Sequence, residues 1–302
     1  MTYAAKKALA NSAPVDLAKA TIAVRVSAGK IGSSRQVGTE QIEVDADKDL
    51  LRVSKRLFDS PEFRAIKNLD SQVMRYLRNK ALPFLTGVHL VPVPMVEEID
   101  ARLLEFAEER GALVDAFIYT YPALCAAAPA TLRALHNPFD YPSVDYVRSK
   151  FYFTWQYVEY GVPGALKAIS SKLWQDEQRK FAASMADAAE EIRQALRGSL
   201  LELVATMRDR LNTPDGKPRI FAPACKNLGS FLADFKFRNV ANDSELQALV
   251  EQAKAMMDGA APEALKDNEA LRAAVRGGMD ELAAKLKTMV VAKPSRKIRL
   301  ED

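Results

Sequence analysis

The stretch that decides the fold runs from Pro163 to Asn212 and reads PGALKAISSKLWQDEQRKFAASMADAAEEIRQALRGSLLELVATMRDRLN. Apolar residues recur through it at steps of three and four, which is the period of an α-helix. Pro163 suits a first helical turn because its missing N–H would have no partner there. The next proline is Pro214, inside the turn signal NTPDG. The sequence therefore predicts one helix over 163–212, about 70 Å long at 1.5 Å per residue.

Two features weaken this predicted helix. Residues 175–180 (QDEQRK) are all polar, and Gly198 costs roughly 1 kcal/mol relative to alanine. The alternative prediction is two ordinary helices divided near Gln178. A helix of this length must bury its apolar stripe on another long helix of the chain or on a second copy of the protein. The stripe residues predicted to form such an interface are Phe181, Met185, Ile192, Leu196, Leu203 and Met207.

Composition sets the class of protein. The 302 residues suffice for one large or two modest domains, and 48% apolar residues support a packed core. A formal charge of +4 permits an anionic partner without requiring one. Residues 1–20 hold no continuous apolar segment of a signal peptide, and the apolar runs look too short and too charged to span a bilayer. We therefore expect a soluble cytoplasmic protein whose two cysteines, Cys125 and Cys225, are free and buried.

The region 1–92 is predicted to be α+β. Alternating β-branched residues indicate a strand over 20–27, followed by a loop over 28–38 and a weak returning strand over 41–44. Ser60, Pro61 and Glu62 are a cap, a first-turn proline and a first-turn acid, so a helix is expected from there to about Ala81. Residues 87–92 predict another strand, which could pair with the first.

The region 93–213 is predicted to be a long-helix hairpin. Its first helix starts at Pro94, ends at Tyr121 before Pro122, and runs antiparallel to the helix over 163–212. The aromatic insert 122–163 is expected to hold short helices at 130–135 and 143–150, and residues 151–159 are either a strand, which is favoured, or the end of a helix. The region 214–302 predicts a turn-rich connection, helices at 224–235, 244–258, 262–276 and 279–291, and a charged tail. The predicted fold is mainly α: an elongated antiparallel pair of long helices, a minor N-terminal β element and a small C-terminal helical bundle.

Residues for catalysis are scarce. The only histidines are His89 and His136, and their spacing from the two cysteines suggests neither a Cys/His nucleophile pair nor a zinc site. Residues 27–34 (SAGKIGSS) follow a strand but lack the first glycine of a nucleotide-binding loop, so a hairpin or flexible loop is favoured. We predict no catalytic residue, metal or cofactor.

Basic residues offer a candidate nucleic-acid-binding surface. One helix face carries Arg64, Lys67, Arg75 and Arg78, with Lys55 and Arg56 just upstream. Clustered Lys and Arg would bind phosphates, whereas the alternative is an ordinary solvated helix face diluted by nearby acids. The aromatic residues of 151–157 could stack on bases, but packing against the helices is favoured. The acids Glu97, Glu98, Glu105, Glu108 and Glu109 are expected on a solvated face.

Three stretches together resemble an uncharacterised family found in phages and their hosts. They are VSAGK (26–30), FLTGVHLVP (84–92) leading into a long acidic helix with a Tyr-Pro end, and KNLGSF (226–231) followed by NVAND (239–243). The family has an aromatic residue before the small-residue loop, where this chain has Val26 or Ser27. Its members are known only as a domain of unknown function, often encoded beside AAA+ ATPases of the MoxR/CobS kind and von Willebrand A-type proteins.

The leading functional hypothesis is a non-enzymatic helical scaffold or adaptor of a phage or phage-like system in a bacterial cytoplasm. It would self-assemble as a homo-oligomer or dock on a partner, for which the resemblance suggests an AAA+ ATPase. The first alternative is a nucleic-acid-binding protein that uses the basic helix face. The second is an enzyme whose site the sequence does not reveal.

Overall fold

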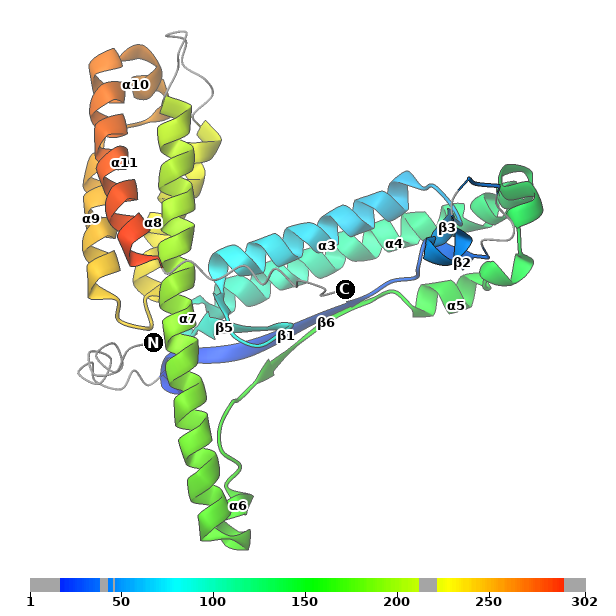
Figure 1. Ribbon diagram of the computed structural model, residues 1–302, viewed down its shortest axis with the longest axis horizontal. Helices are drawn as coiled ribbons and strands as arrows, with labels where there is room; N and C mark the ends of the chain where they lie inside the picture. Colours follow the sequence, from blue (N-terminus) through cyan, green and yellow to red (C-terminus); the bar gives the residue numbers. More distant parts are fainter. Residues whose placement is uncertain (1–16, 39–42, 46, 212–221, 291–302) are drawn as a thin grey trace.

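The computed structural model describes residues 17–38, 43–45, 47–211 and 222–290. Most of these residues are helical, and the strands among them form a four-stranded antiparallel sheet and a separate two-stranded hairpin. The prediction of a mainly helical chain with a small β element is confirmed. Two elongated units cross in Figure 1: the sheet with α3 and α4 runs one way, and α7 with the C-terminal helices runs across it.

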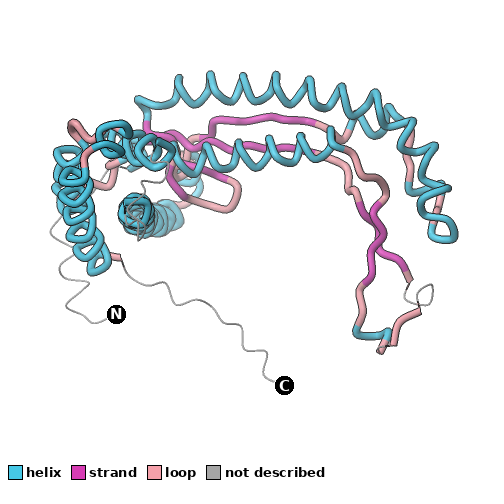
Figure 2. The backbone as a smooth tube through the Cα atoms, turned by 90° about the horizontal axis from the view of Figure 1, so that it is seen from above, coloured by secondary structure: helices cyan, strands magenta, loops and turns pink. Residues whose placement is uncertain are grey.

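The central strand of the sheet is β1 (Thr21–Gly29). It pairs with β5 (Val88–Pro92) on one side and with β6 (Tyr152–Val158) on the other, and β4 (Leu82–Pro83) lies outside β5. The strands predicted at 20–27, 87–92 and 151–159 are therefore present. Val24 and Val91 pack with α3 and α4, while Ala23 and Leu90 belong to the core around α7. The sheet thus joins the two units, and Figure 2 shows it beside the helices.

Helix α3 (Pro61–Lys80) forms as the sequence predicts. Ser60 is its N-cap, and the Ser60 hydroxyl accepts a hydrogen bond from the Phe63 N–H at 3.1 Å. Phe63, Ile66 and Leu77 are buried. The helix packs along α4 (Val96–Leu132), which follows the short η4 (Val93–Met95).

Helix α4 is longer than predicted, because it continues through Pro122 and Pro129 to Leu132. An internal proline removes one helical hydrogen bond. Here the chain around Pro122 is held by burial of Phe117 and Tyr121, and the Tyr121 hydroxyl donates to the Pro142 carbonyl at 3.1 Å. The short helix predicted at 130–135 is the end of α4 plus η5 (Arg133–Leu135). It is followed by η6 (Pro138–Asp140) and α5 (Val144–Ser149).

The hairpin departs from the prediction. Its strands are β2 (Ser34–Val37), within the predicted loop, and β3 (Val53–Arg56), with η3 (Lys48–Leu50) between them. Residues 43–44 of the predicted returning strand are not a strand, and 41–42 lie outside the described residues. Burial of Leu57 and Phe58 holds the hairpin against α4, and the Leu57 N–H donates to the Ser33 carbonyl at 2.9 Å.

The long helix predicted over 163–212 is divided once, at Ser170. Short α6 (Ala165–Ile169) ends there in extended backbone, and α7 (Ser171–Leu211) then runs unbroken for 41 residues, about 60 Å. The Ser170 hydroxyl accepts the Leu173 N–H at 3.3 Å, so this serine caps the new helix. The alternative break near Gln178 is wrong, since residues 175–180 and Gly198 are helical.

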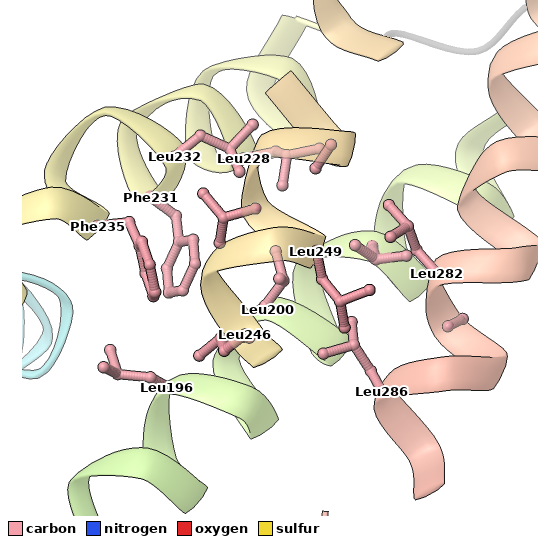
Figure 3. Close-up of a cluster of buried hydrophobic side chains, with 14 of the residues drawn as sticks. Leu196, Leu200, Leu228, Phe231, Leu232, Phe235, Leu246, Leu249, Leu282 and Leu286 are labelled. Atoms are coloured by element: carbon pink, nitrogen blue, oxygen red, sulfur yellow. The ribbon is translucent and has the colours of Figure 1, made fainter. Parts of the chain in front are cut away.

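The predicted antiparallel pairing of α4 with α7 is wrong. Instead α4 packs on α3, and α7 packs on α8 (Ala222–Arg238) and α11 (Glu269–Met289), with α9 (Ser244–Met257) and α10 (Pro262–Asp267) completing that side. The reason is that each apolar stripe has a nearer partner: Leu196 and Leu200 of α7 meet leucines and phenylalanines of α8, α9 and α11 (Figure 3).

Two further expectations fall in the C-terminal part. The predicted break between the helices over 262–276 and 279–291 is wrong, because α11 runs through Gly277 and Gly278 and the break lies at Asn268, the N-cap of α11. A Cβ at Gly278 would lie 2.0 Å from the Met256 sulfur, so this glycine leaves room for the Met256 side chain of α9. The turn-rich connection of 214–223 and the charged tail lie mostly outside the described residues.

Candidate functional site

The predicted basic stripe on α3 is exposed along its length but reaches two different hollows. Arg64 and Lys67 lie near the start of the helix, and Arg75 and Arg78 lie near its end. At 1.5 Å per residue, Arg64 and Arg75 are about 16 Å apart along the axis. The two ends of the basic stripe therefore lie in different surroundings and form two separate candidate binding surfaces.

The first hollow, which we call the serine hollow, has a volume of about 500 Å³ and lies where the β2–β3 hairpin meets the start of α3. Asp59 lies 3.8 Å from a guanidinium nitrogen of Arg56 and 3.7 Å from one of Arg64, so it offsets part of their charge. Cations beside hydroxyl donors are the groups that bind phosphate oxygens. The polar and charged residues of the serine hollow are Ser33, Ser34, Ser54, Arg56, Asp59, Ser60, Arg64 and Lys67.

Lys55 does not join this surface. Its ammonium group lies 2.7 Å from the Asp140 carboxylate and also donates to the Leu135 carbonyl, and its side chain is 9% exposed. Lys55 therefore anchors the hairpin to η5 and η6. Its neighbour Arg56 points outward and stays exposed, as expected for alternate residues of a strand.

The predicted interface on α7 is largely the chain's own core. Ile192, Leu196 and Met207 are fully buried beneath the C-terminal helices, because those helices cover α7 from Ala188 onward. The other three, Phe181, Met185 and Leu203, are half-buried. None of the fully buried residues is available to a second copy in this fold.

An exposed apolar surface lies at the other end of α7, and Phe181 is the one predicted interface residue that falls within it. Ile169 of α6 is 73% exposed and Leu173 of α7 is 50% exposed. Leu166, Trp174 and Phe181 are half-buried beside them. In Figure 1 this end of α7 projects beyond the C-terminal helices, with α6 against it. We call residues 165–181 the α6–α7 tip.

The residues considered for catalysis have structural partners. Lys30, from the loop-like stretch 27–34, lies 2.9 Å from Asp70, and His136 stacks on Tyr141. Burial raises the pKa of the Cys125 and Cys225 thiols, which disfavours the reactive thiolate. Among the described residues no cluster of three or more His, Cys, Asp or Glu could hold a metal ion.

A buried ionic network was missed by the sequence analysis. Arg110 of α4 is almost fully buried, and its guanidinium donates to Asp70 of α3 and to the carbonyls of Gly29 and Tyr152. Sequence alone placed Arg110 beside exposed glutamates, at a position with no visible signal of burial. The network ties two helices to two strands, so its role is structural.

Three aromatic residues of the stretch 151–157 pack as favoured, whereas Tyr152 and Tyr157 are 53% and 39% exposed. Phe151, Phe153 and Trp155 contact the helix cores, and the Trp155 and Tyr157 side chains each donate to one Asp100 oxygen at 2.8 Å. Burial, reinforced by Asp100, raises the pKa of Tyr157. The five glutamates of α4 are exposed, as expected.

One helical segment of the described chain, Val93–Leu135, is long and apolar enough to span a membrane by length and composition alone, contrary to the expectation that every apolar run is too short. Ile99, Leu103 and Phe106 lie in the charged first part of this segment and pack against α3 and the sheet, whereas 28% of its most apolar 18 residues is buried. Comparison with protein-family models, with curated proteins and with solved structures gives no match to this chain.

Proposed function

We propose that this chain is a non-enzymatic scaffold or adaptor that self-assembles through the α6–α7 tip. The observation that carries the proposal is the apolar surface of that tip, where Ile169 of α6 and Leu173 of α7 are at least half exposed and α7 projects beyond the C-terminal helices (Figure 1). Water-exposed apolar area is unfavourable by about 25 cal/mol per Å², and contiguous patches of it mark protein interfaces. The phage setting and an AAA+ ATPase partner rest on the sequence resemblance and remain predictions.

The charged residues of the tip are complementary to those of a second copy of the tip. Within one turn of α7, Asp176 and Glu177 precede Arg179 and Lys180, and each acid pairs with the base three residues later. Two such helices placed antiparallel would set the acids of one against the bases of the other. A two-fold arrangement of this kind brings the same apolar patch of both copies together.

The variant Ile169→Asp with Leu173→Asp tests this proposal. Both side chains are exposed, so the change should leave the helical content unchanged in circular dichroism. We expect light scattering after size exclusion to show an oligomer for the unmodified chain and a 33.4 kDa monomer for the double variant. Leu104→Asp is the matched control, because Leu104 is 51% exposed on α4 and lies outside the tip. An unchanged mass in the double variant would refute assembly through the tip.

The serine hollow supports a second candidate function, nucleic-acid binding. The hydroxyls of Ser33, Ser34 and Ser54 and the cations Arg56, Arg64 and Lys67 could contact successive backbone phosphates, while the Ser60 hydroxyl caps α3. The logarithm of the binding constant should then fall linearly with the logarithm of salt concentration. Arg56→Ala with Lys67→Ala should lower that slope by about two.

The control for this second test is Arg148→Ala with Lys236→Ala, which removes the same formal charge from exposed positions elsewhere. For this control, the logarithm of the binding constant should fall with the logarithm of salt concentration at the same slope as for the unmodified chain. No DNA or RNA binding by that chain at low salt would remove this candidate.

A further inference from the structure

A second hollow, which we call the α3–α8 hollow, lies where the end of α3 meets α7 and α8 and has a volume of about 410 Å³. Arg75 and Arg78 of α3 stand at its exposed rim. Polar side chains come from all three helices, among them Asn79, Asn227, Ser230 and Ser199, whose hydroxyl donates to the Ala195 carbonyl at 2.8 Å. This size is typical of pockets for small molecules.

Arg238, in the last turn of α8, lines the α3–α8 hollow and is only 4% exposed. Within the described part of the chain, its one hydrogen bond runs from Nη2 to the Ala81 carbonyl at 3.5 Å, and its Nε has no partner. The guanidinium also lies 5.5 Å from the Phe231 ring centroid. Burying a cation with so few hydrogen-bond partners costs free energy. Either a bound ligand or a structural role must account for the burial of Arg238.

The hollow also holds two carboxylates, Asp234 and the exposed Glu202, and neither neutralises Arg238. Asp234 is engaged by Lys80 at 2.7 Å, and Lys80 also lies 2.8 Å from Glu98. No ion pair links Arg238 to a carboxylate among the described residues. Burial lowers the pKa of Arg238 to about 10 against the opposing effect of Asp234, which agrees with an uncompensated charge.

A purely structural role for Arg238 accounts poorly for these contacts. A cation near the end of α3 is favourable to the helix dipole. However, a donor–acceptor distance of 3.5 Å makes a weak hydrogen bond. An apolar side chain would fill the same space without a charge to desolvate, and such replacements are often neutral or stabilising.

We propose that the α3–α8 hollow binds the phosphate group of a small organic phosphate, with Arg238 as the buried anchor and Arg75 and Arg78 closing over it from the rim. Guanidinium groups bind phosphate through paired hydrogen bonds, and the amide and hydroxyl donors of Asn227 and Ser230 suit its remaining oxygens. The organic part would lie against Tyr76 and Leu203. This site is separate from the tip and from the serine hollow.

The test measures melting temperature and binding heat with inorganic phosphate, pyrophosphate and AMP as probes. Sodium chloride of equal ionic strength and adenosine are the controls, because they lack the phosphate. We expect the phosphate-bearing probes alone to raise the melting temperature. Arg238→Met should weaken AMP binding at least tenfold while melting at the same or a higher temperature without ligand, since it removes an unpaired buried charge.

Two more variants keep the test decisive. Asn227→Ala changes only an exposed donor and should weaken binding several-fold with folding unchanged. Arg148→Ala removes an equal charge from an exposed position on α5, outside the lining of the hollow, and should bind as the unmodified chain does. The proposal is overturned if no probe binds above the salt control, or if Arg238→Met binds AMP normally. A single-stranded oligonucleotide that binds more tightly than AMP through Arg238 would instead assign the hollow to nucleic-acid phosphates.

Discussion

Removing the Asp70 carboxylate tests how the α3–α4 unit is held together. Arg110 is 2% exposed and donates to Asp70 at 2.8 Å, to the Gly29 carbonyl at 2.7 Å and to the Tyr152 carbonyl at 3.1 Å. Asp70→Ala leaves this guanidinium buried without its carboxylate. Breaking a buried ion pair on one side costs about 3–5 kcal/mol. We expect Asp70→Ala to lower the free energy of unfolding by about 3 kcal/mol, near the low end of that range, because Arg110 keeps its hydrogen bonds to both carbonyls.

Urea denaturation followed by circular dichroism measures this loss. The control is Asp115→Ala, which breaks an exposed pair with Arg148 at 2.6 Å and should cost less than about 1 kcal/mol. Combining Asp70→Ala with Arg110→Met should recover part of the lost stability, because no buried charge is then left unpaired although the Gly29 and Tyr152 carbonyls lose the Arg110 donor. Equal losses for Asp70→Ala and Asp115→Ala would refute the reasoning.

Replacement by alanine should have opposite effects at two glycines. Gly29→Ala should lower the free energy of unfolding by about 1–3 kcal/mol, because its Cβ would lie 2.6 Å from the Lys150 carbonyl oxygen. Gly198→Ala should raise the free energy of unfolding by about 1 kcal/mol, because there is open space around that helical position. Urea titrations of both variants check this, and a loss at Gly198 would contradict it. Burial, with Arg78 adding to it, lowers the pKa of His89 below its ordinary 6.5. The unfolded chain therefore takes up a proton first, so stability should decrease as the pH falls below about 6.5. His89→Gln should remove that part of the decrease, and equal slopes with pH in both proteins would show that His89 is not responsible.

Local signals predicted much of the fold. Ser60, Pro61 and Glu62 specify the start of α3 through cap, fixed φ and helix dipole, and all three effects act within one turn. Period-2 alternation likewise located β1, and the 3.6-residue period located α7. These signals depend on neighbours in sequence, so tertiary contacts did not change them.

Features of the fold that depend on tertiary contacts could not be predicted from local sequence. Pro122 normally ends a helix, but burial of Phe117 and Tyr121 carries α4 past it. An apolar stripe also does not specify its partner, which is why α7 was paired with α4 and its core residues were assigned to an interface. For the site, helical spacing placed Arg64 and Arg75 on one face. The burial of Arg238 depends on a contact with Ala81, 157 residues away.

Sedimentation equilibrium of the unmodified chain, over a range of concentrations, tests the proposed self-assembly most directly. The account predicts an average mass that rises with concentration from one 33.4 kDa chain toward at least two. A constant mass of 33.4 kDa at every concentration, up to the highest that stays soluble, would contradict it.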